Sequence, residues 1–189
     1  MIKIAILGEI GSGKSFVAKN FGHPVFNADL EVSKLYKKDK KVFNRLNKTL
    51  PKYINSFPID KKQIVTAILK NNKNLNKIIR IIHKEIRKKL KLFLKRNKNK
   101  KFVILDIPLF LENKIDSNKD ILIYVKSKKK DIVKRLTKRK DFNKKIYDKF
   151  KKIQLKGDYK KKKSHFIINN KFTKDSVKKE IISILNKIN

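Results

Sequence analysis

The sequence predicts a three-layer α/β fold, in which a five-stranded parallel sheet is covered by helices on both faces. Two observations predict it. Short apolar runs rich in β-branched residues alternate along the chain with longer segments of helical periodicity, and the first run leads directly into a glycine-rich loop. Strands separated by helical crossovers are expected to pair in parallel.

The predicted strands are the five short apolar runs. They cover residues 2–7, 25–26, 102–108, 121–125 and 166–168. The predicted helices are the segments whose apolar residues recur at intervals of three and four. They are residues 15–21, several helices between 31 and 98, a basic helical region over 131–155, and a closing helix over 177–188. The core is therefore expected in residues 1–30, 99–135 and 161–189 of one domain spanning 1–189.

Lysine dominates the composition: the net charge is +37, and only six of the 53 basic residues are arginine. Such a charge attracts polyanions. The lysines are scattered over the whole chain, however, and Asn and Ile are also abundant, which favours a biased coding composition over a nucleic-acid footprint. We expect no nucleic-acid partner, and a monomer or weak homo-oligomer.

The absence of cysteine and of long apolar runs limits the kinds of site that the protein can have and where it is expected. The chain has no cysteine, which excludes disulfides, thiolate zinc sites and cysteine nucleophiles. No apolar run approaches the length of a membrane span, and the N-terminus lacks a signal-peptide pattern. We therefore expect a cytoplasmic protein without a membrane partner.

Residues 8–15 read GEIGSGKS and match the P-loop pattern GxxxxGK[ST] at a strand–loop–helix junction. In a P-loop, backbone N–H groups and the following helix N-terminus surround phosphate oxygens. We expect Lys14 to reach the β- and γ-phosphates and Ser15 to ligate Mg²⁺. The predicted ATP-binding residues are Glu9, Ile10, Gly11, Ser12, Gly13, Lys14, Ser15 and Phe16.

Two carboxylates are expected near this loop, because the C-terminal ends of parallel strands share one edge of the sheet. Asp106 resembles a carboxylate that orients Mg²⁺ through water, or it caps the next element. Asp29 could accept a proton from an attacking hydroxyl, or it caps a helix starting at Leu30. The residues alone leave both alternatives open.

The series of motifs resembles the dephospho-CoA kinase family across nearly the whole chain and in the same order. The matching segments are the P-loop, Asn27-Ala28-Asp29, residues 83–87 (HKEIR), residues 106–112 (DIPLFLE), Arg135 and Arg139, Gln154 and Lys160, and residues 164–170 (SHFIINN). The P-loop alone would fit many enzymes, whereas the later segments narrow the resemblance to this family.

The resemblance implies transfer of the ATP γ-phosphate to the ribose 3′-hydroxyl of dephospho-CoA, with Mg²⁺ as cofactor and these two small molecules as partners. It implies that Asp29 is the general base and that Arg139, with Lys14, stabilises the transferring phosphoryl group. It also implies a helical CoA-binding region and a short helical lid. The CoA-binding region is 31–98, in which His83 and Arg87 would hold the substrate, and the lid is 136–160. Pro108 and Leu109 are further substrate contacts.

Four positions depart from the family pattern: Phe16, Asn27, Lys84 and His165. Lys84 stands where proline is usual, and His165 stands where aspartate is usual.

Two other functions compete with the resemblance. One is another small P-loop kinase, such as a nucleoside monophosphate kinase. The other is a basic P-loop module that binds nucleic acid and uses ATP as a switch.

Overall fold

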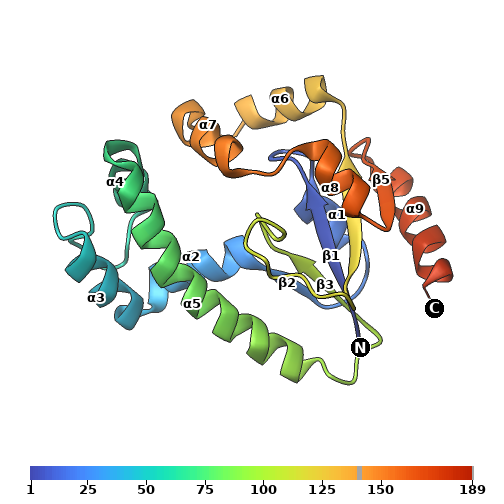
Figure 1. The fold of residues 1–189 in the computed structure, drawn as a ribbon, viewed down its shortest axis with the longest axis horizontal. Helices are drawn as coiled ribbons and strands as arrows, with labels where there is room; N and C mark the ends of the chain where they lie inside the picture. Colours follow the sequence, from blue (N-terminus) through green and yellow to red (C-terminus); the bar gives the residue numbers. More distant parts are fainter. Residues whose placement is uncertain (140–141, 189) are drawn as a thin grey trace. The chain divides into compact units, whose positions relative to one another are not determined.

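A computed structural model describes residues 1–139 and 142–188 (Figure 1). The chain divides into two compact units. The first comprises Met1–Asn27, Asn97–Asn143 and Lys149–Asn189, and the second comprises Ala28–Arg96 and Lys144–Asp148. Each unit is described by itself.

The first unit is built on a five-stranded sheet with the strand order β2-β3-β1-β4-β5, in which every neighbouring pair is parallel. The predicted fold class and all five predicted strands are confirmed. The strands are β1 Ile2–Gly8, β2 Val25–Asn27, β3 Phe102–Asp106, β4 Ile121–Lys126 and β5 Phe166–Asn169. β1, β3 and β4 are largely buried, as their continuous apolar runs predict for central parallel strands.

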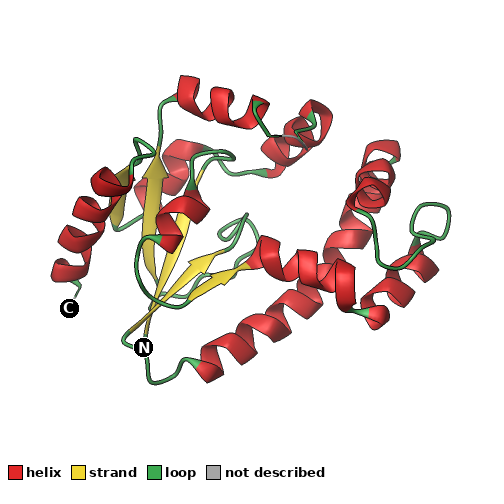
Figure 2. Cartoon of the chain, turned by 180° about the vertical axis from the view of Figure 1, so that it is seen from behind, coloured by secondary structure: helices red, strands yellow, loops and turns green. Residues whose placement is uncertain are grey.

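Helices cover both faces of this sheet. α1 (Lys14–Lys19) and α9 (Lys174–Lys187) place Val17, Ala18 and Val177, among others, against Ile4, Ile104 and the other side chains of one face. α8 (Gly157–Lys163) lies against β1 and β4 on the opposite face (Figures 1 and 2). The three-layer arrangement that the sequence predicts is therefore present.

The segment 131–155 is largely helical, as predicted. Two helices occupy this region, α6 (Lys129–Thr137) and α7 (Lys144–Ile153), and residues 140–141 between them lie outside the described part of the chain. The apolar face of α6 ends at Leu136, and the following residues as far as Asp141 are polar or charged. A helix continued through this stretch would have no apolar face to bury.

The second unit is helical, as predicted. It contains α2 (Ala28–Lys38), α3 (Lys40–Thr49), α4 (Lys61–Lys70), α5 (Asn72–Arg96) and the first residues of α7. α5 buries Leu75, Ile78, Ile82 and Ile86, which recur at the intervals of three and four that predict a helix, and it continues unbroken through Lys84. No helix in the described ranges is both long and apolar enough to cross a bilayer.

Asp29 is not at the tip of β2, where the sequence places it. α2 begins at Ala28, directly after β2, so Asp29 is the second residue of the helix. The predicted helix start at Leu30 is two residues late, and Asp29 is not the capping residue that this start would make it. No loop separates β2 from α2, so no turn residue in the sequence marks where the strand ends and the helix begins. A carboxylate in the first turn still complements the helix dipole.

His165, which stands where the family pattern has aspartate, forms hydrogen bonds with both backbone groups of Leu122. Its backbone N–H donates to the Leu122 carbonyl at 2.9 Å, and its Nδ1 accepts a hydrogen bond from the Leu122 N–H at 3.0 Å. The histidine thus satisfies both backbone groups of Leu122 at the start of β4. The bond requires the tautomer that carries its proton on Nε2.

We predict that His165→Leu lowers the free energy of unfolding by about 1 kcal/mol, because the Leu122 N–H loses its acceptor. His165→Asn retains an acceptor and should stay closer to wild type. Urea denaturation followed by circular dichroism measures both values. Equal losses in the two variants would show that the ring's packing, and not the hydrogen bond, is what β4 depends on.

Candidate active site

The P-loop connects the C-terminal end of β1 to the first residue of α1. At Gly13 the backbone has a φ of 90°, in the left-handed region, and a Cβ there would lie 2.2 Å from Asn170 Nδ2 and 2.7 Å from the Phe172 ring. Glycine is required at this position on both counts. The loop is thus held tightly against the segment that follows β5.

Two side chains hold the middle of the loop through one carbonyl oxygen. Asn170 Nδ2 donates to the Ser12 carbonyl at 2.9 Å, and Ser127 Oγ donates to the same oxygen at 2.8 Å. Asn170 is buried, and its own Oδ1 accepts from the Phe172 N–H. Neither residue was predicted as part of the site. Asn170 could have been found as the last residue of the FIINN segment, whereas Ser127 gives no sequence signal.

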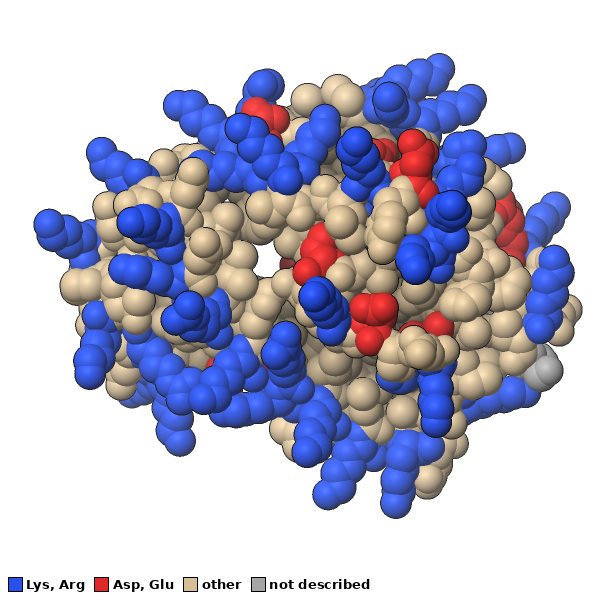
Figure 3. All heavy atoms as spheres, in the orientation of Figure 1, with Lys and Arg blue, Asp and Glu red and all other residues tan. Residues whose placement is uncertain are grey.

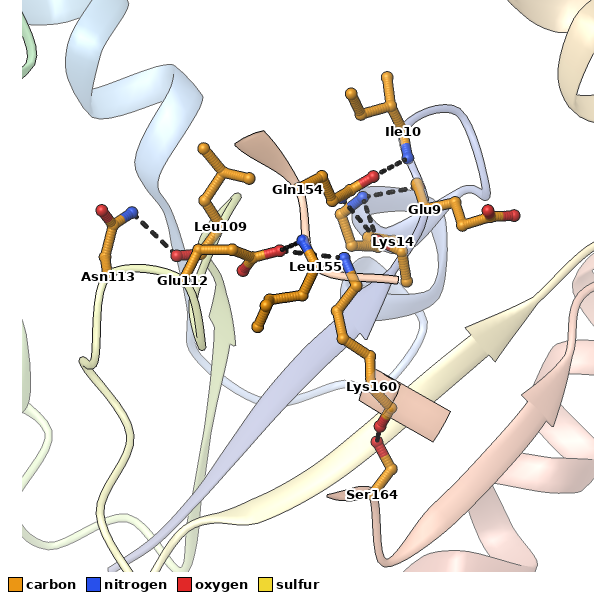
Figure 4. A network of polar contacts seen from close by, with 11 residues as sticks. Glu9, Ile10, Lys14, Leu109, Glu112, Asn113, Gln154, Leu155, Lys160 and Ser164 are labelled. Carbon is orange, nitrogen blue, oxygen red and sulfur yellow. Dashed lines mark hydrogen bonds and ion pairs between the residues drawn. The ribbon is translucent and has the colours of Figure 1, made fainter. Parts of the chain in front are cut away.

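Lys14 lies over its own loop (Figure 4). Its Nζ donates to the Glu9 carbonyl at 2.9 Å and to the Gly8 carbonyl at 3.3 Å. The ammonium group is therefore on the strand side of the loop, at the end of β1. It can exchange carbonyl oxygens for phosphate oxygens without a change in the fold, which fits the role predicted for the P-loop lysine.

Asp106 ends β3 and lies within hydrogen-bonding reach of two polar side chains. The Asn27 side-chain amide donates to Asp106 Oδ2, and the Ser15 hydroxyl also bonds to this carboxylate. Burial raises the pKa of Asp106, and the bonds from Ser15 and Asn27 and the charges of Lys14 and Lys19 oppose that rise. Asn27, the departure from the family's aspartate, thus donates to the carboxylate without adding a second negative charge.

The pairing of Ser15 with Asp106 fits a Mg²⁺ site. The sequence assigned these two residues to the metal, and the structure brings their oxygens together. Within the described ranges, no group of three or more His, Cys, Asp or Glu side chains could hold a metal ion. Mg²⁺ needs no such group, because it keeps several waters and takes few protein ligands beside phosphate oxygens.

A cavity adjoins the loop at this edge of the sheet. Gly8, Lys14, Leu109, Phe110, Glu112 and Lys160 are among the residues that line it. Leu109 has a φ of 54°, a conformation that costs a side-chain-bearing residue about 1–2 kcal/mol, and its carbonyl accepts a 2.8 Å hydrogen bond from Asn113 Nδ2. Pro108 precedes it and is half-buried. Both predicted substrate contacts therefore lie in the segment that borders the cavity.

α6 is packed on the P-loop, because Ile132 and Leu136 occupy the space that a side chain at Gly11 would need. Arg139 is exposed just beyond this helix. Arg135 lies over the Phe172 ring at 4.1 Å from its centroid.

Phe16, predicted to bind ATP, packs its side chain against the hydrophobic core, so the backbone N–H is the group it can offer a phosphate.

Three predicted site residues belong to the helical unit. Asp29 is exposed in the first turn of α2. His83 and Arg87 lie one turn apart on α5, where burial, followed by the charge of Arg87, lowers the pKa of His83. The Arg87 side chain is exposed.

Basic side chains are spread over most of the face shown in Figure 3 and do not gather at one element. A surface of this charge attracts a polyanionic substrate.

Comparison with known proteins gives a consistent result. A model of the dephospho-CoA kinase family matches residues 2–175. The dephospho-CoA kinase of Wolbachia sp. subsp. Brugia malayi (strain TRS) is 30% identical, over 98% of this chain and 97% of the relative. That of Rickettsia bellii (strain RML369-C) is 32% identical, over 98% of this chain and 96% of the relative.

Solved structures share the fold. The crystal structure of TT1252 from Thermus thermophilus matches with a TM-score of 0.81 at 21% identity, over 100% of this chain and 98% of the other. A dephospho-CoA kinase from Campylobacter jejuni matches with a TM-score of 0.62 at 22% identity, over 98% and 96% of the two chains. With the family model spanning the P-loop, the Asp106 segment and the FIINN segment, this chain belongs to the dephospho-CoA kinase family and is an ATP-dependent kinase.

Proposed function

We propose that the protein transfers the γ-phosphate of ATP to the ribose 3′-hydroxyl of dephospho-CoA, through the residues described below. The observation that carries the residue assignment is the convergence of Lys14, Ser15 and Asp106 at one edge of the sheet. These groups supply the cation, the hydroxyl and the carboxylate that phosphoryl transfer from a nucleotide needs. The family supplies the acceptor.

The P-loop holds the triphosphate. Backbone N–H groups from Gly13 to Ser15 would surround the phosphates, because the Ile10 and Ser12 N–H groups already donate to Gln154 Oε1 and the Glu9 carbonyl. Lys14 would move from the Gly8 and Glu9 carbonyls to the β- and γ-phosphate oxygens. Ser15 and, through water, Asp106 hold Mg²⁺, which when bound neutralises charge on those oxygens. Most of the catalysis is then positioning and electrostatics.

Asp29 orients and deprotonates the 3′-hydroxyl in this proposal. It follows Asn27, whose side chain donates to Asp106, by two residues. Chain connectivity therefore keeps the α-carbons of Asn27 and Asp29 within about 7 Å of each other. The positive end of the α2 dipole favours the ionised carboxylate, which is the form that accepts a proton.

The remaining predicted residues stabilise the transferring phosphoryl group or bind the acceptor. Arg139, carried at the end of α6, neutralises charge on the phosphoryl group in flight, and closure of the lid keeps water from competing with the acceptor. His83 and Arg87 hold the CoA portion, and Pro108 and Leu109 contact the substrate beside the P-loop. Coenzyme A synthesis in the cytoplasm is the process that this activity would serve.

Asp29→Asn should lower kcat with dephospho-CoA by about 100-fold or more and leave ATP binding unchanged, because only the proton acceptor is lost. Asp175→Asn is a matched control, since Asp175 is also the second residue of its helix, α9. Turnover and calorimetric ATP binding are measured on both variants. Wild-type turnover in Asp29→Asn would remove this residue from the base role. An equal loss in the control would point to a general helix-stability effect.

Ser15→Ala should raise the Mg²⁺ concentration needed for half-maximal activity roughly tenfold, because one of the few protein ligands of the ion is lost. Ser15→Thr keeps the hydroxyl and should behave like wild type. Titration of activity with Mg²⁺ at saturating ATP gives both values. An unchanged Mg²⁺ requirement in the alanine variant would contradict the ligand assignment.

A further inference from the structure

The segment between α7 and α8 touches the P-loop from outside the phosphate-binding motif. Gln154 Nε2 donates to the Gly8 carbonyl at 3.3 Å, and Gln154 Oε1 accepts from the Ile10 N–H at 3.4 Å (Figure 4). One amide side chain therefore holds the two peptide groups on either side of Glu9. Both bonds are long, so their geometry depends on where the backbone of residue 154 is fixed.

The start of α8 approaches the same part of the loop. A side chain at Gly157 would lie 2.9 Å from the Tyr124 hydroxyl and 3.6 Å from Glu9 Oε1. The absence of a side chain at position 157 thus lets the helix come close to Glu9 and β4. Gln154 and Gly157 together cover the first half of the P-loop.

A buried ion pair fixes this segment. Glu112 Oε1 accepts from the Leu155 N–H at 2.9 Å and lies 3.2 Å from Lys160 Nζ. The Glu112 and Lys160 side chains are 9% and 3% exposed. Glu112 thereby anchors the residue directly after Gln154, and Lys160 keeps the buried carboxylate from being an uncompensated charge. Burial lowers the pKa of Lys160, and the charges of Glu112 and Glu9 oppose that change.

The Gly8 carbonyl has two donors here, Lys14 and Gln154. When Lys14 turns to the phosphates of a bound nucleotide, Gln154 remains as the donor for this carbonyl and keeps the Ile10 peptide oriented. A loop already held in its binding geometry loses less conformational freedom when ATP binds.

We propose that Gln154 is a positioning residue for the ATP-binding loop, and that the Glu112–Lys160 ion pair acts through it by fixing the backbone at Leu155. The inference rests on the proposed function, because it assumes that the loop binds ATP. It assigns a role to three residues of the matching segments, Glu112, Gln154 and Lys160, that the chemical step itself does not need.

Gln154→Ala should weaken ATP binding about tenfold, as expected for the loss of two neutral hydrogen bonds. The KM for ATP should rise by a similar factor, while kcat and the KM for dephospho-CoA stay near wild type. Calorimetric titration with ATP and Mg²⁺, together with initial rates, measures these values. Lys152→Ala, an exposed residue of α7, is the control and should change none of them.

The link from the ion pair to Gln154 is tested by combining variants. Glu112→Gln should weaken ATP binding in the wild-type background but add little in the Gln154→Ala background, because the two changes remove the same hold on the loop. If Glu112→Gln does not fold, Lys160→Met takes its place, with Lys161→Met as the exposed control.

Three results would overturn the proposal. Unchanged ATP affinity in Gln154→Ala would remove the positioning role, and fully additive losses in the double variant would separate the ion pair from Gln154. Wild-type protein that fails to bind ATP would overturn both this inference and the proposed function. Wild-type protein that binds ATP without phosphorylating dephospho-CoA would overturn the proposed function alone, since the binding comparison would still decide the role of Gln154.

Discussion

The parallel pairing of β1 with β3 is the constraint on which the nucleotide-binding edge depends. Its register aligns Ile2 with Phe102 and Ala5 with Leu105, so the P-loop leaves one strand beside the point where Asp106 ends the other. A shift of one residue would turn the buried side chains to the wrong face. The apolar packing of this sheet thereby positions Ser15 and Lys14 relative to a carboxylate from a distant part of the chain.

The P-loop itself is held mainly by contacts from the second half of the sequence. Asn170 and Ser127 hold the Ser12 carbonyl, and Gln154 holds the peptides around Glu9. The glycines that let the backbone surround phosphate also make the free loop costly to order. Side-chain hydrogen bonds from the residues that follow β4 and β5, and from the segment after α7, offset that cost without placing more carboxylates beside the phosphates.

The features predictable from the sequence were those encoded over short distances. Strand positions, the spacing of apolar residues on α5 and the strand–P-loop–helix junction are local patterns, and each is confirmed. The start of α2 was misplaced because β2 runs into it without a turn residue, and the break between α6 and α7 has no glycine or proline to mark it. The positioning roles of Ser127, Gln154 and Asn170 depend on tertiary contacts more than 100 residues apart in sequence, which no local pattern records.

The most direct test of the central claim follows the γ-phosphate of ATP to its acceptor. Wild-type protein is incubated with Mg²⁺ and ATP labelled with ¹⁸O in the γ-phosphate, with either dephospho-CoA or a nucleoside monophosphate as acceptor, and the products are identified by mass spectrometry. We expect labelled coenzyme A with the first acceptor and no phosphorylated product with the second. Label found only in a nucleoside diphosphate, or only in free phosphate, would contradict it.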